Sequence, residues 1–139
     1  MVFGDLMIMP AIVMGLVISI VNVGVMLKDA SGPGGSTIGH GVGAFFGVII
    51  LTFLSMNYTL FLAWFPAIQG GILGNEIVIR IALGSIAGIY IHIHSSAFKG
   101  ARGAGSHETW LHSFGLGILI AASPYLWLLI GPMLPAWAQ

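Results

Sequence analysis

Five histidines are the residues of this chain best suited to chemistry, because imidazole binds transition metals and haem iron. They are His40, His92, His94, His107 and His112, and the carboxylate of Glu108 directly follows one of them. Their spacing matches no known metal-binding helix. His92 and His94 are two positions apart and would point to opposite sides of a helix, whereas His107 and His112 are five positions apart rather than four. Any shared site must therefore be assembled from several segments.

The composition excludes several classes of protein. Hydrophobic residues make up 58% of the 139 residues and charged residues 6%, with a mean hydropathy of +1.04. Soluble domains carry about 25% charged residues, so this chain cannot cover a water-soluble fold with charge. Four scattered lysines and arginines cannot form the basic face that nucleic acid requires. The absence of cysteine excludes disulfides, iron–sulfur clusters and thiol catalysis.

Four apolar runs dominate the sequence and predict its fold. They cover residues 6–27, 38–63, 76–97 and 109–130, and each can cross a hydrocarbon core of about 30 Å as a helix of about 20 residues. The runs are continuously apolar rather than alternating, which favours helices over the strands of a barrel. We therefore expect an all-α integral membrane protein, a single transmembrane domain over residues 1–139 that forms a four-transmembrane-helix up-and-down bundle. Pro124 should kink the last helix past its middle.

The distribution of cations predicts how this bundle sits in the membrane. Lys28, Lys99 and Arg102 lie in or beside the first and third connections, which share a face of the bundle. The opposite face has only Arg80, one turn inside the third helix. Short loops rich in lysine and arginine remain in the cytoplasm, so both chain termini are expected on the extracytoplasmic side of a multi-pass protein.

In this bundle all five histidines lie near the cytoplasmic face. His92 continues a stripe of glycines along the third helix, and His40 shares a face with Gly43 and Gly47, so both should face the interior. We expect these two to converge with His112, with His94, His107 and Glu108 as outer neighbours. Such a cluster would suit a transition metal, or haem held by two axial histidines. The sequence favours a third interpretation, in which the histidines cap helices and meet loop carbonyls or lipid phosphates.

Small residues spaced four positions apart predict where the helices approach each other. Helices in lipid associate through close backbone packing, which glycine, alanine and serine permit. The third helix has such a pair and the fourth a Ser–Gly–Ala stripe, but the glycine series in the second helix is the least accidental. It should be a tight seam, either within the bundle or between protomers. The glycines concerned are Gly39, Gly43, Gly47, Gly84, Gly88 and Gly117.

Glu76 and Arg80 are spaced to form an ion pair along the third helix, with the glutamate first, the favourable order. A long arginine side chain near a helix end usually extends to the aqueous interface, and we expect Arg80 to do so. The alternative is that Arg80 faces inward and binds an anion.

No catalytic constellation is visible, because every acidic residue lies at a helix end and none adjoins a candidate nucleophile. A proton- or sodium-coupled transporter would bury an ionisable group near the midplane, where this chain has none. The sequence therefore favours a small structural or accessory subunit of a homo- or hetero-oligomeric membrane complex, in contact with lipid and with other membrane subunits or itself. The alternative is a metal- or haem-binding redox or transport subunit that uses the histidine cluster.

The topology is testable with single cysteines, since the chain has none of its own. A membrane-impermeant maleimide should label Ser31→Cys and Ala104→Cys from one side of the membrane and Gly71→Cys from the other. Labelling of positions 31 and 104 from opposite sides would contradict the four-helix arrangement.

Overall fold

The computed structural model describes residues 6–29, 37–100 and 110–138, and within these ranges it is helical with no strands. Each of the four expected helices is present, with ends that differ from the expected ones by up to three residues. The long helices are α1 (Ile8–Asp29), α2 (Thr37–Trp64), α4 (Glu76–Gly100) and α5 (Trp110–Ile130). The short elements are α3 (Pro66–Gln69) and three 3₁₀ turns, η1 (Ile72–Gly74), η2 (Gly131–Met133) and η3 (Ala136–Ala138).

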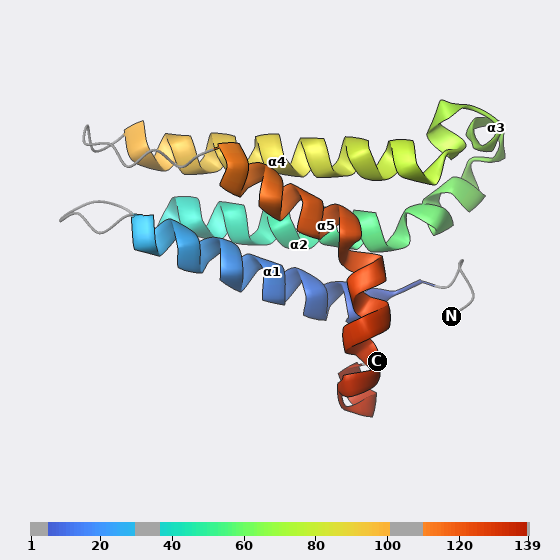
Figure 1. The fold of residues 1–139 in the computed structure, drawn as a ribbon, viewed down its shortest axis with the longest axis horizontal. Coiled ribbons are helices and arrows are strands. Elements are labelled where there is room, and N and C mark those ends of the chain that lie inside the picture. Colours follow the sequence, from blue (N-terminus) through green and yellow to red (C-terminus); the bar gives the residue numbers. More distant parts are fainter. Residues whose placement is uncertain (1–5, 30–36, 101–109, 139) are drawn as a thin grey trace.

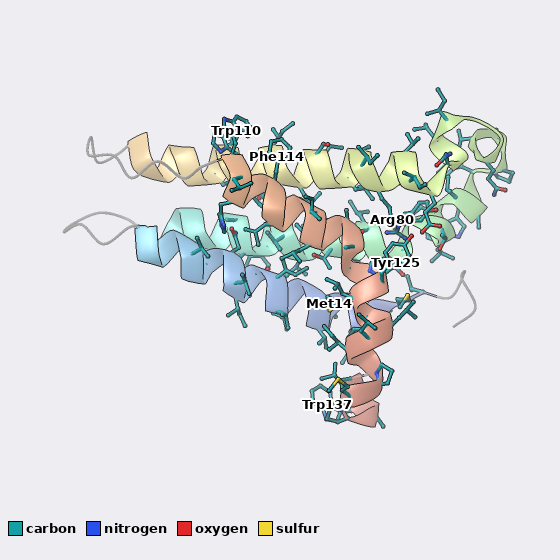
Figure 2. All side chains as sticks on the ribbon, viewed as in Figure 1. Met14, Arg80, Trp110, Phe114, Tyr125 and Trp137 are labelled. Atoms are coloured by element: carbon teal, nitrogen blue, oxygen red, sulfur yellow. The ribbon has the colours of Figure 1, made fainter. Side chains whose placement is uncertain are left out.

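The long helices alternate in direction along the chain (Figure 1). Helix α1 packs mainly against α2, and α4 packs mainly against α5. Helix α2 joins these two pairs, because it also contacts both α4 and α5. Helix α5 runs along α4 for its first turns and then bends away from the bundle beside Tyr125 (Figures 1 and 2). Pro124 lies inside this helix, so the bend occurs where the sequence predicts a kink, because proline cannot donate the helical hydrogen bond.

All four long helices contain a segment long and apolar enough to cross a membrane: Ile8–Val25, Gly43–Trp64, Glu76–His94 and Trp110–Met133. Large apolar side chains lie on both sides of these helices. Some form the core, including Met14, Val48 and Ile120, and others such as Ile20 and Ile50 face outward, 64% and 59% exposed. The protein is thus an all-helical bundle whose outer surface has the composition of a multi-pass membrane protein.

The tightest backbone approach lies between α4 and α5. A Cβ atom added to Gly117 would overlap the carbonyl oxygen of Gly84 and lie 3.0 Å from the amide nitrogen of Gly88. One added to Gly88 would lie 2.9 Å from Cδ1 of Phe114. Three of the predicted packing glycines therefore meet at one helix crossing, and a side chain at Gly117 would push the two backbones apart.

The glycine series of α2 has two described members, Gly43 and Gly47, and only Gly47 is close-packed against another helix. A Cβ added to Gly47 would overlap the ring and hydroxyl of Tyr90, whereas at Gly43 the nearest atom, Cδ2 of His94, would be 3.8 Å away. The surroundings of Gly39 lie outside the described residues. Within the chain there is therefore room for a methyl group at Gly43, and the seam along Gly39, Gly43 and Gly47 stays a prediction.

Two neighbouring glycines of α5 test the α4–α5 crossing. Gly117→Ala should destabilise the protein by about 1–3 kcal/mol through overpacking. Gly115→Ala is the matched control, since a Cβ added there would meet nothing within 4 Å and alanine favours a helix. The free energies of unfolding of both variants can be measured by titrating detergent-solubilised protein with SDS. Equal stability of the two variants would contradict the crossing.

Candidate functional site

The histidines that the structure describes lie near one end of the bundle and point in different directions. The His92 ring stacks on the indole of Trp110 at 3.6 Å and 14°, and its Nδ1 lies 3.4 Å from the hydroxyl of Ser113 on α5. The His94 ring lies against Tyr90, with Nδ1 3.0 Å from the Tyr90 carbonyl oxygen, and faces Gly43 on α2. Because the two histidines are two positions apart, their rings face different helices: His92 faces α5 and His94 faces α2.

Only some of the residues predicted to form a metal or haem site are described by the structure. His107 and Glu108 lie outside them, and so does the side chain of His40, although its backbone belongs to α2. Among the residues that the structure describes, no three histidine or acidic side chains are grouped closely enough to hold a metal ion. The convergence of His40, His92 and His112 stays a prediction.

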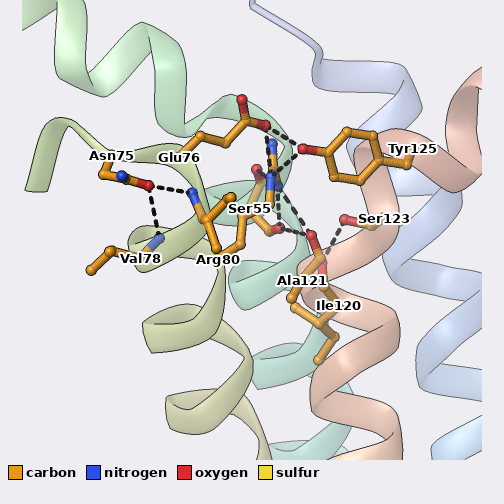
Figure 3. A network of polar contacts seen from close by, with 10 residues as sticks. Ser55, Asn75, Glu76, Val78, Arg80, Ile120, Ala121, Ser123 and Tyr125 are labelled. Carbon is orange, nitrogen blue, oxygen red and sulfur yellow. Dashed lines mark hydrogen bonds and ion pairs between the residues drawn. The ribbon is translucent and has the colours of Figure 1, made fainter.

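The most developed polar cluster lies at the opposite end, around Arg80 (Figure 3). Its side chain comes from the second turn of α4, and the residue is only 8% exposed. The Nε group donates hydrogen bonds to Oε1 of Glu76 at 2.9 Å and to the hydroxyl of Tyr125 at 3.2 Å. The Nη1 group donates to the carbonyl oxygens of Ala121 at 3.1 Å and Ser55 at 3.4 Å.

Two aromatic rings complete this cluster. The guanidinium carbon lies 5.0 Å from the centre of the Tyr58 ring and 4.9 Å from that of Tyr125, distances at which a cation is attracted to the ring face. The Tyr125 hydroxyl in turn donates to Oε1 of Glu76 at 2.5 Å. Arg80 therefore joins α2, α4 and α5 at one point, through both charge and hydrogen bonds.

The turn of α5 that precedes Pro124 contributes carbonyl acceptors to side-chain hydrogen bonds. Pro124 has no amide hydrogen, so the Ile120 carbonyl loses its helical partner and accepts instead from the Ser123 hydroxyl at 2.7 Å. In the same turn, the Ala121 carbonyl accepts hydrogen bonds from Arg80 and, at 3.4 Å, from the Ser55 hydroxyl. The turn that precedes the kink therefore supplies a carbonyl acceptor to side chains from α2 and α4.

The expectation that Arg80 extends to the aqueous interface was wrong. Its side chain turns inward because two other helices supply carbonyl acceptors and aromatic faces within its reach. The Glu76–Arg80 ion pair is present, and the glutamate side chain is 38% exposed while the arginine side chain is 10% exposed. Among the partners of Arg80, only Glu76 follows from local spacing, whereas Tyr125 and Ala121 are 45 and 41 residues away in the chain.

Other polar groups inside the helices also serve packing. Asn57 on α2 accepts a hydrogen bond from the Met7 amide at 2.7 Å and donates to the Met7 carbonyl at 3.3 Å, which fixes the start of α1. The Tyr90 hydroxyl donates to the Gly43 carbonyl at 3.0 Å. The fully buried amide of Asn22 has no hydrogen-bond partner among the described residues.

A groove of about 420 Å³ lies between α4 and α5. Arg80 and Tyr125 are at one end and Phe114 marks the other, with Gly84 and Ser85 among the small residues between them (Figure 2). The groove is otherwise lined by aliphatic side chains, and its volume lies in the range of small-molecule sites, about 300–1,000 Å³.

The fold and these sites define an all-helical protein with four helices able to cross a membrane. No family model matches the chain, and no curated protein or solved structure is significantly similar to it. Its function must therefore be argued from its own residues.

Two tyrosines provide a matched test of the Arg80 cluster. Tyr125→Phe removes a hydroxyl that bonds both Glu76 and Arg80, and should cost about 1 kcal/mol of unfolding free energy. Tyr58→Phe keeps the ring beside Arg80 and removes a hydroxyl that bonds none of the described residues, so it should be nearly silent. Thermal unfolding in detergent would compare them, and a larger loss for Tyr58→Phe would refute the assignment.

Proposed function

We propose that this protein is a small integral membrane protein that acts as a structural subunit of a homo- or hetero-oligomeric membrane complex. In this proposal its four apolar helices lie in the bilayer. The polar groups within them serve mainly to hold the helices together, as the bonds of Arg80, Asn57 and Tyr90 to other helices suggest. Its role would then depend on the surfaces through which it contacts neighbouring subunits.

The observation that carries this proposal is an exposed apolar face on the segment that follows the kink. This segment, residues 125–138, is here called the C-terminal arm. The arm leaves the direction of the bundle (Figure 1), and one of its sides is covered, since Trp127 and Ala138 are 1% and 2% exposed. Its other side presents Leu129, Met133 and Trp137, which are 72%, 84% and 72% exposed. An apolar face of this kind, projecting sideways from a small bundle, suits contact with another membrane subunit.

The proposed orientation follows from the cations. The start of α1 and the C-terminal arm lie toward one end of the bundle, and the ends of α1 and α4, which contain Lys28 and Lys99, lie toward the other (Figure 1). The positive-inside tendency then puts both chain termini on the extracytoplasmic side. The alternative of a metal- or haem-binding subunit stays a prediction from sequence, since no group among the described residues favours it.

Two exposed residues of equal accessibility test the role of the arm. Crosslinking in native membranes should give species larger than the monomer, and Met133→Ser should reduce their yield by removing apolar contact area. Leu111→Ser is the control, because Leu111 is 83% exposed but lies on the first turn of α5, away from the arm. Recovery of monomer alone from the parent protein would contradict the proposed function, and an equal effect of both variants would contradict the role of the arm.

A further inference from the structure

The groove between α4 and α5 has one polar end and a long apolar remainder. Its α4 wall extends from Ile77 to Ser85 and its α5 wall from Phe114 to Tyr125. At 1.5 Å per residue these walls are about 12 Å and 16 Å long, so the groove is elongated along the helices. Arg80 is the only charged residue among those that line it, and it lies with Tyr125 at one end.

Arg80 retains hydrogen-bonding capacity at that end. Its Nε and Nη1 groups are engaged by Glu76, Tyr125, Ser55 and Ala121. Its Nη2 group donates no hydrogen bond to any residue in the described part of the chain, and its N–H groups can donate charge-assisted hydrogen bonds to a phosphate oxygen. The groove therefore ends in donors that an anionic headgroup can use.

The shape and lining of the groove suit an acyl chain. Its volume of about 420 Å³ is elongated along α4 and α5 and is lined almost entirely by apolar side chains. Ile77, Ile81 and Ile118 are 69%, 65% and 66% exposed and flank a floor of small residues that includes Gly84 and Ala121. A narrow apolar channel with a single cationic end is complementary to one chain of a lipid with a negative headgroup.

We infer that this groove binds an anionic phospholipid, with one acyl chain between α4 and α5 and a phosphate oxygen accepting hydrogen bonds from Nη2 of Arg80. This inference rests on the membrane location in the proposed function, but not on assembly with partners. Glu76 already neutralises part of the charge of Arg80. The preference for an anionic headgroup should therefore be modest, and should increase when Glu76 is made neutral.

Native mass spectrometry of the detergent-solubilised full chain tests this inference with added phosphatidylglycerol or phosphatidylcholine of identical acyl chains. The parent protein should retain one phosphatidylglycerol in preference to phosphatidylcholine. Ser85→Phe, which fills the groove, should lose retention of both lipids. Ile89→Phe is the control, since Ile89 is 45% exposed on the same helix but does not line the groove.

Glu76→Gln tests the headgroup separately, because glutamine keeps a hydrogen-bond acceptor for Tyr125 and Arg80. It should increase the preference for phosphatidylglycerol several-fold. Retention by Ser85→Phe equal to that of the parent would overturn the groove as the site, and an unchanged preference in Glu76→Gln would overturn the headgroup contact. A parent dimer that retains no lipid, with a second copy covering the groove, would also overturn the inference. Lipid retained by a protein that stays monomeric in native membranes would support the groove while contradicting the proposed function.

Discussion

A guanidinium group surrounded by apolar helices must find acceptors for its hydrogen bonds, and this requirement organises one end of the molecule. Arg80 satisfies it with a carboxylate from its own helix, carbonyl groups from α2 and α5, and the faces of two tyrosines. Because an unsatisfied polar group in such surroundings costs several kcal/mol, the three helices cannot separate here without a large penalty. The cluster thus fixes the relative positions of α2, α4 and α5.

Two features of the sequence make this cluster possible. The glycines at the α4–α5 crossing allow the backbones to approach, so that the side chain of Arg80 reaches the Ala121 carbonyl. Pro124 bends α5 next to Tyr125, whose hydroxyl bonds Arg80, and redirects the chain into the C-terminal arm. The same kink therefore contributes to the packing of the bundle and to the apolar face that we propose as a subunit contact.

The sequence predicts the helices well because their signal is local. Length and apolarity define the four runs, Pro124 marks the bend, and the spacing of Glu76 and Arg80 predicts their ion pair. The direction of Arg80 could not be predicted in this way, because it depends on acceptors more than 20 residues away in the chain. Spacing of small residues likewise indicates a packing face without its neighbour, so it does not predict that Tyr90 packs on Gly47.

If Arg80 stabilises the bundle from inside, its replacement by methionine should lower the stability of the protein. Methionine has a similar length and is apolar, so it fills the same space among the helices but leaves Glu76 and the Ala121 carbonyl without their cationic donor. The unfolding free energy of Arg80→Met, measured by SDS titration of the detergent-solubilised protein, should fall by at least about 2 kcal/mol. An unchanged or increased unfolding free energy would contradict the account, because it is the result expected of an arginine that extends into water.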